Sequence, residues 1–333
     1  MIPDVIMRVV ARYGRDLQPI GTVRSLGGYG GLSGSRIWRY SSALGEILIR
    51  SWPEATRGRR RIETIHGWLR NVVDLPFVPQ PFPALDGRTV HEFEGILWEA
   101  TPWLPGSPDP VRPPRMERVR AAFKALGMFH ARLSKGAVAA ASPGLRLRGE
   151  ELRRLLSGGF DAIEAELNAQ PDDPCGPPAQ EWLGLARRVA PEALKMIDAS
   201  GRLASPLQPC LRDARPEHFL FEGDRLTGLI DFGAMDVEST AADLARLNGE
   251  WLPLPEGEAL RDEGIKAYSE VAPLHFNHLT IAKAFEAAAD VLIAERWIRW
   301  RFRERRRFDD PNATVDGIGR GLARLRKLSL RLR

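Results

Sequence analysis

The chain has 333 residues with 44% hydrophobic and 27% charged side chains, ordinary globular values that exclude a disordered or fibrous chain. This length predicts two domains or one large bilobal domain. The apolar runs are too short to span a membrane, and the N-terminus lacks a basic-then-apolar leader, so we expect a cytoplasmic protein. Two cysteines, Cys175 and Cys210, are too few for a disulfide-stapled scaffold or a four-ligand zinc site.

The net charge of +5 comes almost entirely from arginine. Only six of the 48 basic residues are lysine, and the first 123 residues contain none. A GC-rich genome accounts for this bias, but the bias has a chemical consequence. Any N-terminal function that needs a cationic side chain must use arginine.

Residues 21–50 predict two strands around a glycine-rich turn, followed by a third strand. The turn from Leu26 to Ser35 contains five glycines, and Arg36 to Tyr40 alternates with the period of two expected of a strand. The apolar run before Arg50 predicts the third strand over 46–50. A helix over 54–69 and a hairpin over 89–93 and 95–99 follow.

Six prolines from Pro102 to Pro114 predict a connector, and the chain beyond it is mainly helical. We therefore predict an α+β protein with a sheet-rich N-lobe over 1–99, a hinge over 100–114 and a helical C-lobe over 115–333. Predicted elements of the C-lobe are helices over 116–133, 149–170, 180–199 and from 240 onward, with two short strands between 207 and 231.

Two aspartates carry the most informative pattern. Asp213 lies in the loop 211–213, an apolar hairpin follows, and Asp231 comes at the end of the hairpin in the segment 231–233, Asp-Phe-Gly. A hairpin can bring both carboxylates to the same side of a cleft. Such a pair suits phosphoryl transfer, in which one carboxylate orients the attacking hydroxyl and the other binds Mg²⁺.

The order of these motifs resembles the aminoglycoside phosphotransferase and choline kinase-like family, small-molecule kinases with the protein-kinase-like two-lobed fold. The resemblance runs from about residue 20 to 300: glycine-rich loop, cation on the third strand, helix, connector, aspartate loop and Asp-Phe-Gly. Residues 98–106 are similar to the family's hinge, and 126–131 to its Leu-x-x-Leu-His-x helix. The resemblance implies an ATP- and Mg²⁺-dependent transfer of the γ-phosphoryl group to a hydroxyl of a small molecule.

The resemblance also implies a set of nucleotide-binding residues. Arg50 would hold the α- and β-phosphates, steadied by Glu63. The backbone at Glu99 and Thr101 would bind adenine. The backbone of the glycine-rich loop would cover the phosphates, through Gly28, Gly30, Gly31, Ser33, Gly34 and Ser35.

The same resemblance assigns the chemistry to the later motifs. Asp213 would be the catalytic base, and Asp231 would bind Mg²⁺. His218 occupies the second metal position. Asp243 matches an aspartate that braces the catalytic loop from the following helix.

Three residues depart from the family pattern. Arg50 replaces a lysine, Leu211 replaces the histidine of His-Gly-Asp, and His218 replaces a metal-binding asparagine. Mg²⁺ prefers oxygen ligands, so His218 is a poor metal ligand and is better suited to contact a phosphate. These departures favour a second hypothesis, a catalytically degenerate kinase-fold protein that binds nucleotide or a partner without transferring phosphate.

Seven arginines between 296 and 307, interleaved with aromatic residues, suggest a nucleic-acid surface as a third hypothesis. We favour a helix whose aromatics pack while its arginines reach water, and we expect no nucleic-acid partner and no membrane span. The sequence does not define the acceptor or the oligomeric state. We weakly disfavour a polycationic aminoglycoside, although an acidic surface for one is available at Glu250, Glu256, Glu258, Asp262 and Glu263.

Overall fold

The computed structural model describes residues 4–27, 34–52, 58–108, 114–252, 254–306, 308 and 310–331. The chain forms two compact units, each made of two stretches of sequence. The first unit comprises Met1–Leu133 and Pro216–Met235, and the second comprises Ser134–Arg215 and Asp236–Arg333. These units differ from the predicted lobes, because the helix after the connector and the hairpin between the two aspartates belong to the first unit.

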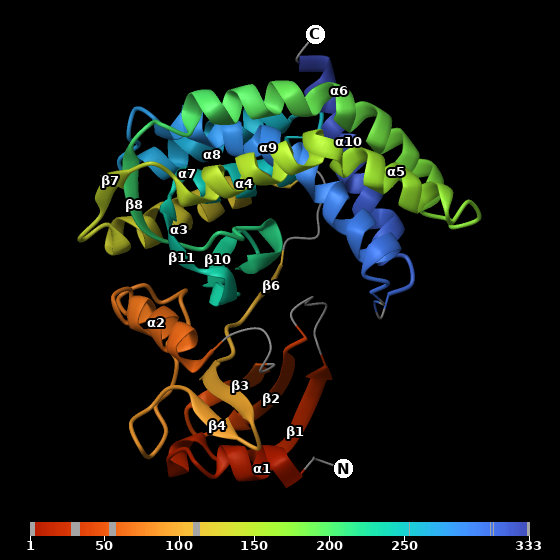
Figure 1. Ribbon diagram of the computed structural model, residues 1–333. Coiled ribbons are helices and arrows are strands. Elements are labelled where there is room, and N and C mark those ends of the chain that lie inside the picture. Colours follow the sequence, from red (N-terminus) through yellow and green to blue (C-terminus); the bar gives the residue numbers. More distant parts are fainter. Residues whose placement is uncertain are drawn as a thin grey trace. The chain divides into compact units, whose positions relative to one another are not determined.

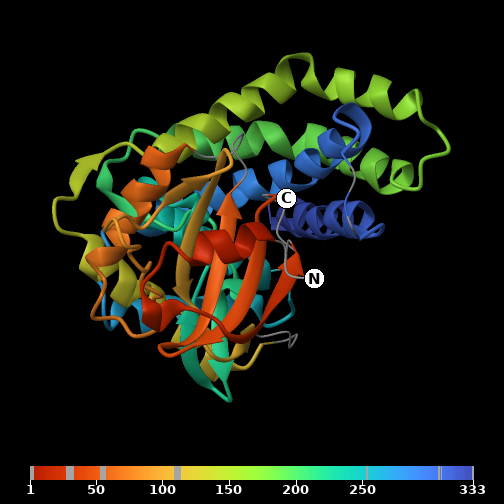
Figure 2. The same cartoon turned by 90° about the horizontal axis from the view of Figure 1, so that it is seen from below.

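An antiparallel five-stranded sheet in the order β1-β2-β3-β5-β4 forms the base of the first unit. A short helix, α1 (Asp4–Val10), crosses one face of this sheet (Figure 2) and packs its apolar side chains on Tyr40, Ile47 and Ile49. The strands are β1 (Ile20–Gly27), β2 (Arg36–Ser42), β3 (Gly45–Trp52), β4 (His91–Phe93) and β5 (Ile96–Pro102).

The sequence predictions for this sheet are largely confirmed. The strands expected over 36–40, 46–50, 89–93 and 95–99 are all present, as β2 to β5. Helix α2 (Arg59–Arg70) corresponds to the predicted helix over 54–69. Helix α1 and the 3₁₀ turn Arg15–Leu17 were not predicted, because seven and three residues are too short to show a period.

Hydrogen bonds between distant segments explain why the hairpin after Asp213 belongs to the first unit. The middle strand, β9 (Phe219–Glu222), pairs both with β10 (Arg225–Leu229) and with β6 (Ser107–Pro108). The Leu229 N–H donates to the Phe77 carbonyl over 2.7 Å, and α3 (Met116–Leu133) contacts β10. The predicted boundary at the connector 100–114 was based on composition. Composition does not reveal pairings between residues more than 100 positions apart.

The second unit is mainly helical and holds a small sheet in the order β11-β8-β7 (Figure 1). Its strands are β7 (Val138–Ala140), β8 (Ser205–Cys210) and β11 (Asp236–Ser239). Its helices are α4 (Pro143–Arg154), α5 (Phe160–Asn168), α6 (Gly176–Ser200), α7 (Ala241–Trp251), α8 (Gly257–Ser269), α9 (His278–Ile298) and α10 (Ala313–Arg331).

Two predictions for this region need correction. The single helix expected over 149–170 is two helices, α4 and α5, because Ser157 and Gly158 leave the helical conformation, Gly158 with a φ of 97°. Four strands, β8 to β11, lie between 205 and 239, where two were expected over 207–231. Strand β8 contains Pro206 and Pro209, which do not indicate a strand, and β11 lies beyond the expected range. No helix in the described ranges is both long and apolar enough to cross a bilayer.

The core of the second unit lies where α6, α9 and α10 meet. Trp182 on α6 is fully buried, and its indole N–H donates to the Val291 carbonyl over 3.1 Å. Helix α10 approaches α9 closely at Gly321, where an added Cβ would lie 2.8 Å from the Ala294 backbone nitrogen. A glycine is therefore required at this crossing, whereas Gly319 on the same helix faces open space.

We expect Gly321→Ala to lower the free energy of unfolding by about 1–3 kcal/mol, because the new methyl group overpacks the α9–α10 crossing. Gly319→Ala is the matched control and should raise stability by about 0.5–1 kcal/mol, since alanine favours the helix. Chemical denaturation of both variants measures the difference. Equal stability of the two variants would contradict the close approach.

A buried polar cluster joins α7, α9 and α10. Arg324 donates to Asp290 over 2.7 Å, and the Asn248 amide faces Glu286 at 3.5 Å. Burial, reinforced by the nearby charge of Asp290, raises the pKa of Glu286 to about 7. The folded state therefore favours the protonated form of Glu286 at pH values where the unfolded chain is ionised.

This shift predicts a pH-dependent loss of stability. Below pH 4.5 Glu286 is protonated in both the folded and the unfolded state, so its titration does not change the free energy of unfolding. As the pH rises from 4.5 to 7, only the unfolded state releases the proton, so stability falls by up to about 3 kcal/mol. Glu286→Gln should remove this fall, as measured by denaturation at several pH values. The exposed control Glu192→Gln should keep the wild-type profile, and parallel profiles for all three proteins would refute the prediction.

Candidate functional site

Arg50 lies at the centre of the site in the first unit. It stands opposite Glu99 in the β3–β5 ladder, and its Nε is 3.7 Å from Glu99 Oε1. Its Nη1 is 3.9 Å from Asp231 Oδ1, and its guanidinium lies 4.8 Å from the Trp52 ring. Among the residues that the structure describes, none offers the buried Nε a hydrogen-bond acceptor. Arg50 is thus held by two loose ionic contacts and retains donors for a further anion.

The carboxylate of Glu99 is buried and shared with a histidine. His66 Nε2 lies 2.8 Å from Glu99 Oε2, while His66 Nδ1 lies 2.7 Å from Thr89 Oγ1. Burial by itself would raise the pKa of Glu99, but the His66 hydrogen bond and the charges of His66 and Arg50 outweigh it and lower that pKa. The result is an ionised carboxylate facing Arg50.

The expectation that Glu63 steadies Arg50 is not met in the described part of the chain. Glu63 is exposed, and the carboxylates near Arg50 are those of Glu99 and Asp231. Helix α2 turns His66 toward the sheet, together with Ile62 one turn earlier. The spacing from Ile62 to His66 indicates that His66 lies on the buried face of the helix, because residues four apart share a helix face.

Asp231 combines a strained backbone with an accessible carboxylate. Its φ and ψ of 62° and 63° place it in the left-handed region, at the start of the 3₁₀ turn Phe232–Ala234. Its side chain is 48% exposed, and His218 Nε2 lies 3.6 Å from Oδ2. The next residue, Phe232, packs on Phe129 with ring centroids 5.8 Å apart. The packed phenylalanine anchors the turn that presents the carboxylate.

These residues can accept a nucleotide and a divalent metal on chemical grounds. Mg²⁺ in proteins is commonly held by one or two carboxylates together with phosphate oxygens, and Asp231 supplies one such carboxylate. Arg50 supplies cationic donors beside it for phosphate. His218 offers nitrogen, so it suits a phosphate contact better than a Mg²⁺ ligand.

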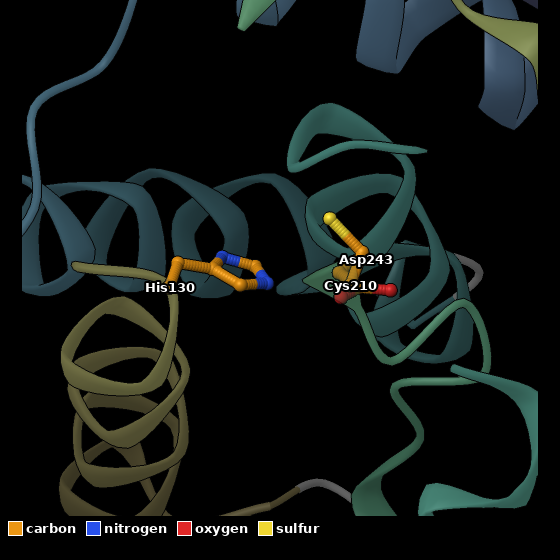
Figure 3. Close-up of side chains that lie close together, drawn as sticks. All are labelled: His130, Cys210 and Asp243. Atoms are coloured by element: carbon orange, nitrogen blue, oxygen red, sulfur yellow. The ribbon is translucent and has the colours of Figure 1, made fainter. Parts of the chain in front are cut away.

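In the second unit, Asp243 organises the loop that carries Asp213. The fully buried Asp243 carboxylate accepts the backbone N–H groups of Leu211 over 2.7 Å and of Arg212 over 2.6 Å. Arg212 has a φ of 63°, a left-handed turn that aims both N–H groups at one side chain. Figure 3 shows Asp243 beside Cys210, the last residue of β8. The prediction that Asp243 braces this loop is confirmed.

Cys210 has a structural role, as expected. Its side chain is completely buried, and burial raises the pKa of its thiol well above the ordinary value. The thiol donates to the Glu238 carbonyl over 3.2 Å. A buried thiol of high pKa is a poor nucleophile, so Cys210 acts as a small apolar residue.

Asp213 is half-exposed and bordered by arginines. Arg246, three residues after Asp243 on α7, donates from Nε to Asp213 Oδ1 over 3.0 Å, and Arg215 Nε lies 3.6 Å from Oδ2. Arg246 is itself paired with Glu250 one turn further along the helix. Arg246 was not predicted from the sequence; only its spacing from Asp243 along one helix indicated it. The two arginines fix the orientation of the Asp213 carboxylate.

The remaining predicted residues are divided between described and undescribed parts of the chain. Gly28, Gly30, Gly31 and Ser33 lie outside the described residues. Gly34 has a φ of 73°, and Ser35 is buried at the start of β2. Glu99 and Thr101 both lie on β5, so adenine recognition by their backbone remains a prediction.

The arginine-rich segment near 300 is engaged in ion pairs within the second unit. Arg301 pairs with Asp173 over 2.8 Å and Arg303 with Glu166 over 2.7 Å. The Arg306 guanidinium lies 4.8 Å from the Trp300 ring, while Arg307 lies outside the described residues. The aromatic side chains contact one another, namely Trp297, Trp300 and Phe308. These contacts fit the packed helix that the sequence favoured over a nucleic-acid surface.

The loop contacts of Asp243 generate a stability prediction. Asp243→Asn places an amide where two backbone N–H groups need an acceptor, so we expect stability to fall by about 2–4 kcal/mol. The control is Asp236→Asn, because the half-exposed Asp236 pairs with Arg212 at 3.3 Å and should contribute about 1 kcal/mol or less. Thermal denaturation of both variants tests this, and an Asp243→Asn protein as stable as wild type would contradict it.

The fold is that of the kinase-like phosphotransferases. A model of the phosphotransferase enzyme family matches residues 28–279, so the chain belongs to that family. A comparison with curated protein sequences finds no match. The family resemblance inferred from the sequence is therefore confirmed.

Solved structures of such enzymes share the fold of the whole chain. An amicoumacin kinase in complex with AMP-PNP and Ca²⁺ superposes with a TM-score of 0.67 at 13% identity, covering 99% of this chain and 94% of its own. An aminoglycoside phosphotransferase from Alicyclobacillus acidocaldarius gives 0.68 at 15%, covering 100% and 96%. A spectinomycin phosphotransferase in complex with ADP and spectinomycin gives 0.64 at 11%, covering 98% and 96%. The predicted kinase-like α+β fold is confirmed.

Proposed function

We propose that this protein transfers the γ-phosphoryl group of ATP to a hydroxyl of a small molecule, with a divalent metal as cofactor. One observation carries the proposal: Arg50 on β3 lies within 3.9 Å of Asp231, which follows the β9–β10 hairpin. A phosphate-binding cation next to an exposed, metal-binding carboxylate is the arrangement that phosphoryl transfer requires. The nucleotides and Ca²⁺ bound by the structural relatives support the same assignment.

The residues of the first unit would bind and orient the nucleotide. Arg50 would hold phosphate oxygens, kept in place by the ionised Glu99. Asp231 would hold the metal, which neutralises charge on the phosphates when bound. His218, 3.6 Å from Asp231, would donate to a phosphate oxygen. The arginine at position 50 can form two parallel hydrogen bonds with a phosphate, which a lysine cannot.

The second unit would supply the group that handles the acceptor. Asp213 would accept a hydrogen bond from the acceptor hydroxyl, orient its oxygen toward the γ-phosphorus and take its proton as the new P–O bond forms. Arg246, which donates to Oδ1, would hold the carboxylate in its orientation toward this hydroxyl. Asp243 would keep the loop in place through its two backbone contacts.

Nucleotide binding is tested first by thermal denaturation with ATP, with and without Mg²⁺. A ligand at 100 times its Kd stabilises the native state by about 2.7 kcal/mol, so a clear rise in Tm is expected. The rise should be larger with Mg²⁺, and Asp231→Asn should abolish the metal-dependent part. The control is Asp224→Asn in the same hairpin, whose half-exposed carboxylate pairs with Arg115 and Arg118.

Catalysis is tested by Mg²⁺-dependent release of ADP, with water as the slow acceptor. We expect Asp213→Asn to reduce the rate by about 10²–10⁴-fold, because a positioned proton acceptor contributes that much, while the Tm shift with ATP persists. Nucleotide binding without any turnover in wild type would instead support the catalytically degenerate hypothesis. Absence of both binding and turnover would refute the proposed function.

A further inference from the structure

Helix α4 in the second unit begins beside the loop that carries Asp213. The Ser142 hydroxyl donates to Glu238 Oε1 over 2.6 Å, and the Gly144 N–H donates to Oε2 over 2.7 Å. Glu238 lies on β11, whose first residue, Asp236, stands opposite Cys210 at the end of β8. The start of α4 is therefore tied to β11, which pairs with β8, the strand that leads into the loop of Asp213.

Arg148 lies one helical turn after Gly144 on α4, and its contacts there are loose. Its Nη1 makes a long hydrogen bond of 3.4 Å to the Gly144 carbonyl, and the guanidinium lies 4.8 Å from the Phe285 ring. Among the described residues, none places a carboxylate within ion-pair distance of Arg148. Burial lowers its pKa to about 10, so the side chain remains cationic at neutral pH.

The charged groups that face Arg148 come from every neighbouring element. Glu151 on the same helix and Glu238 on β11 raise its pKa, whereas Arg212 of the catalytic loop and Arg296 on α9 lower it. Glu151 and Arg296 are exposed. Arg148 bonds to Gly144, whose N–H donates to Glu238 on β11. Asp236 on the same strand pairs with Arg212, the residue before Asp213.

Two carboxylates on β11, those of Glu238 and Asp236, already have partners of their own. Glu238 is satisfied by the Ser142 hydroxyl and the Gly144 N–H at the start of α4. Asp236 pairs with Arg212 at 3.3 Å. A half-buried guanidinium without a carboxylate is costly to maintain, and an anionic ligand would recover that cost.

Resting on the proposed function, we propose that the acceptor carries an anionic group, a carboxylate or a phosphate, which Arg148 binds while the reacting hydroxyl lies at Asp213. The planar guanidinium fits either group through paired hydrogen bonds. Arg212 and Arg296 add to the attraction by their positive charge.

The opposite class of acceptor finds little support in the structure. A polycationic aminoglycoside would need free carboxylates, but four of the five acidic residues considered for it already pair with cations. The pairs are Glu250 with Arg246, Glu258 with Arg331, Asp262 with Arg261 and Glu263 with Lys266.

The decisive experiment measures anion binding to the full-length protein without requiring a known acceptor. Thermal shifts are titrated with inorganic phosphate and, separately, with malonate, at ionic strength held constant with chloride. We expect a saturable rise in Tm for wild type and an apparent Kd at least tenfold weaker for Arg148→Gln. Arg148→Lys should recover part of the affinity, which excludes loss through misfolding. The stronger of the two anions identifies phosphate or carboxylate as the preferred group.

Two further variants locate the bound anion. Arg146→Gln is the matched control, because Arg146 is exposed on the same helix and pairs with Glu150. It should bind as wild type does, and so should Arg50→Gln, which removes the proposed nucleotide contact. Loss of binding in Arg50→Gln with retention in Arg148→Gln would place the anion at the nucleotide site and refute the inference. No saturable shift with either anion would also refute it.

An acceptor assay then separates this inference from the proposed function. ADP release is followed with Mg²⁺-ATP and glycerate, glycerol 3-phosphate, glycerol or kanamycin. We expect turnover of an anionic acceptor, with KM raised at least tenfold by Arg148→Gln and kcat changed less than threefold. Turnover of glycerol or kanamycin alone would refute the anionic acceptor but support the phosphotransferase. Anion binding at Arg148 without ADP release from any acceptor would refute the phosphotransferase alone.

Discussion

Burying the carboxylate of Glu99 in the first unit requires polar partners, and Arg50 and His66 supply them. The pairing fixes how β3 faces β5 and how α2 lies against the sheet. Glu99 contacts the Nε of Arg50, whose Nη1 lies 3.9 Å from Asp231 Oδ1. The proposed phosphate and metal contacts both depend on this arrangement. It places the Arg50 guanidinium next to the half-exposed Asp231 carboxylate.

A second buried carboxylate plays the corresponding part in the other unit. Asp243 must be satisfied by donors, and it takes them from the backbone at Leu211 and Arg212. The same helix carries Arg246, which reaches Asp213 over 3.0 Å. Helix α7 therefore sets both the shape of the loop and the orientation of its half-exposed aspartate. Leu211, which replaces the family's histidine, contributes its backbone N–H to this bracing.

Several of the chain's many arginines lie at positions where we propose that anions bind. Arginine stands at position 50 where the family has lysine, arginines border Asp213, and Arg148 lies on α4. Guanidinium groups bind phosphates and carboxylates through paired hydrogen bonds. A protein that handles ATP and an anionic acceptor would use this property twice, at Arg50 and at Arg148.

The sequence by itself determined the strands around Arg50, the two-aspartate motif, the family and the bracing role of Asp243, because alternation, motif order and spacing are local properties of the chain. Only the tertiary structure decided that Glu99 rather than Glu63 faces Arg50, that Arg246 holds Asp213, and that the β9–β10 hairpin joins the first unit. These outcomes depend on which helix face is buried and on pairings between residues far apart in sequence, which local patterns do not encode.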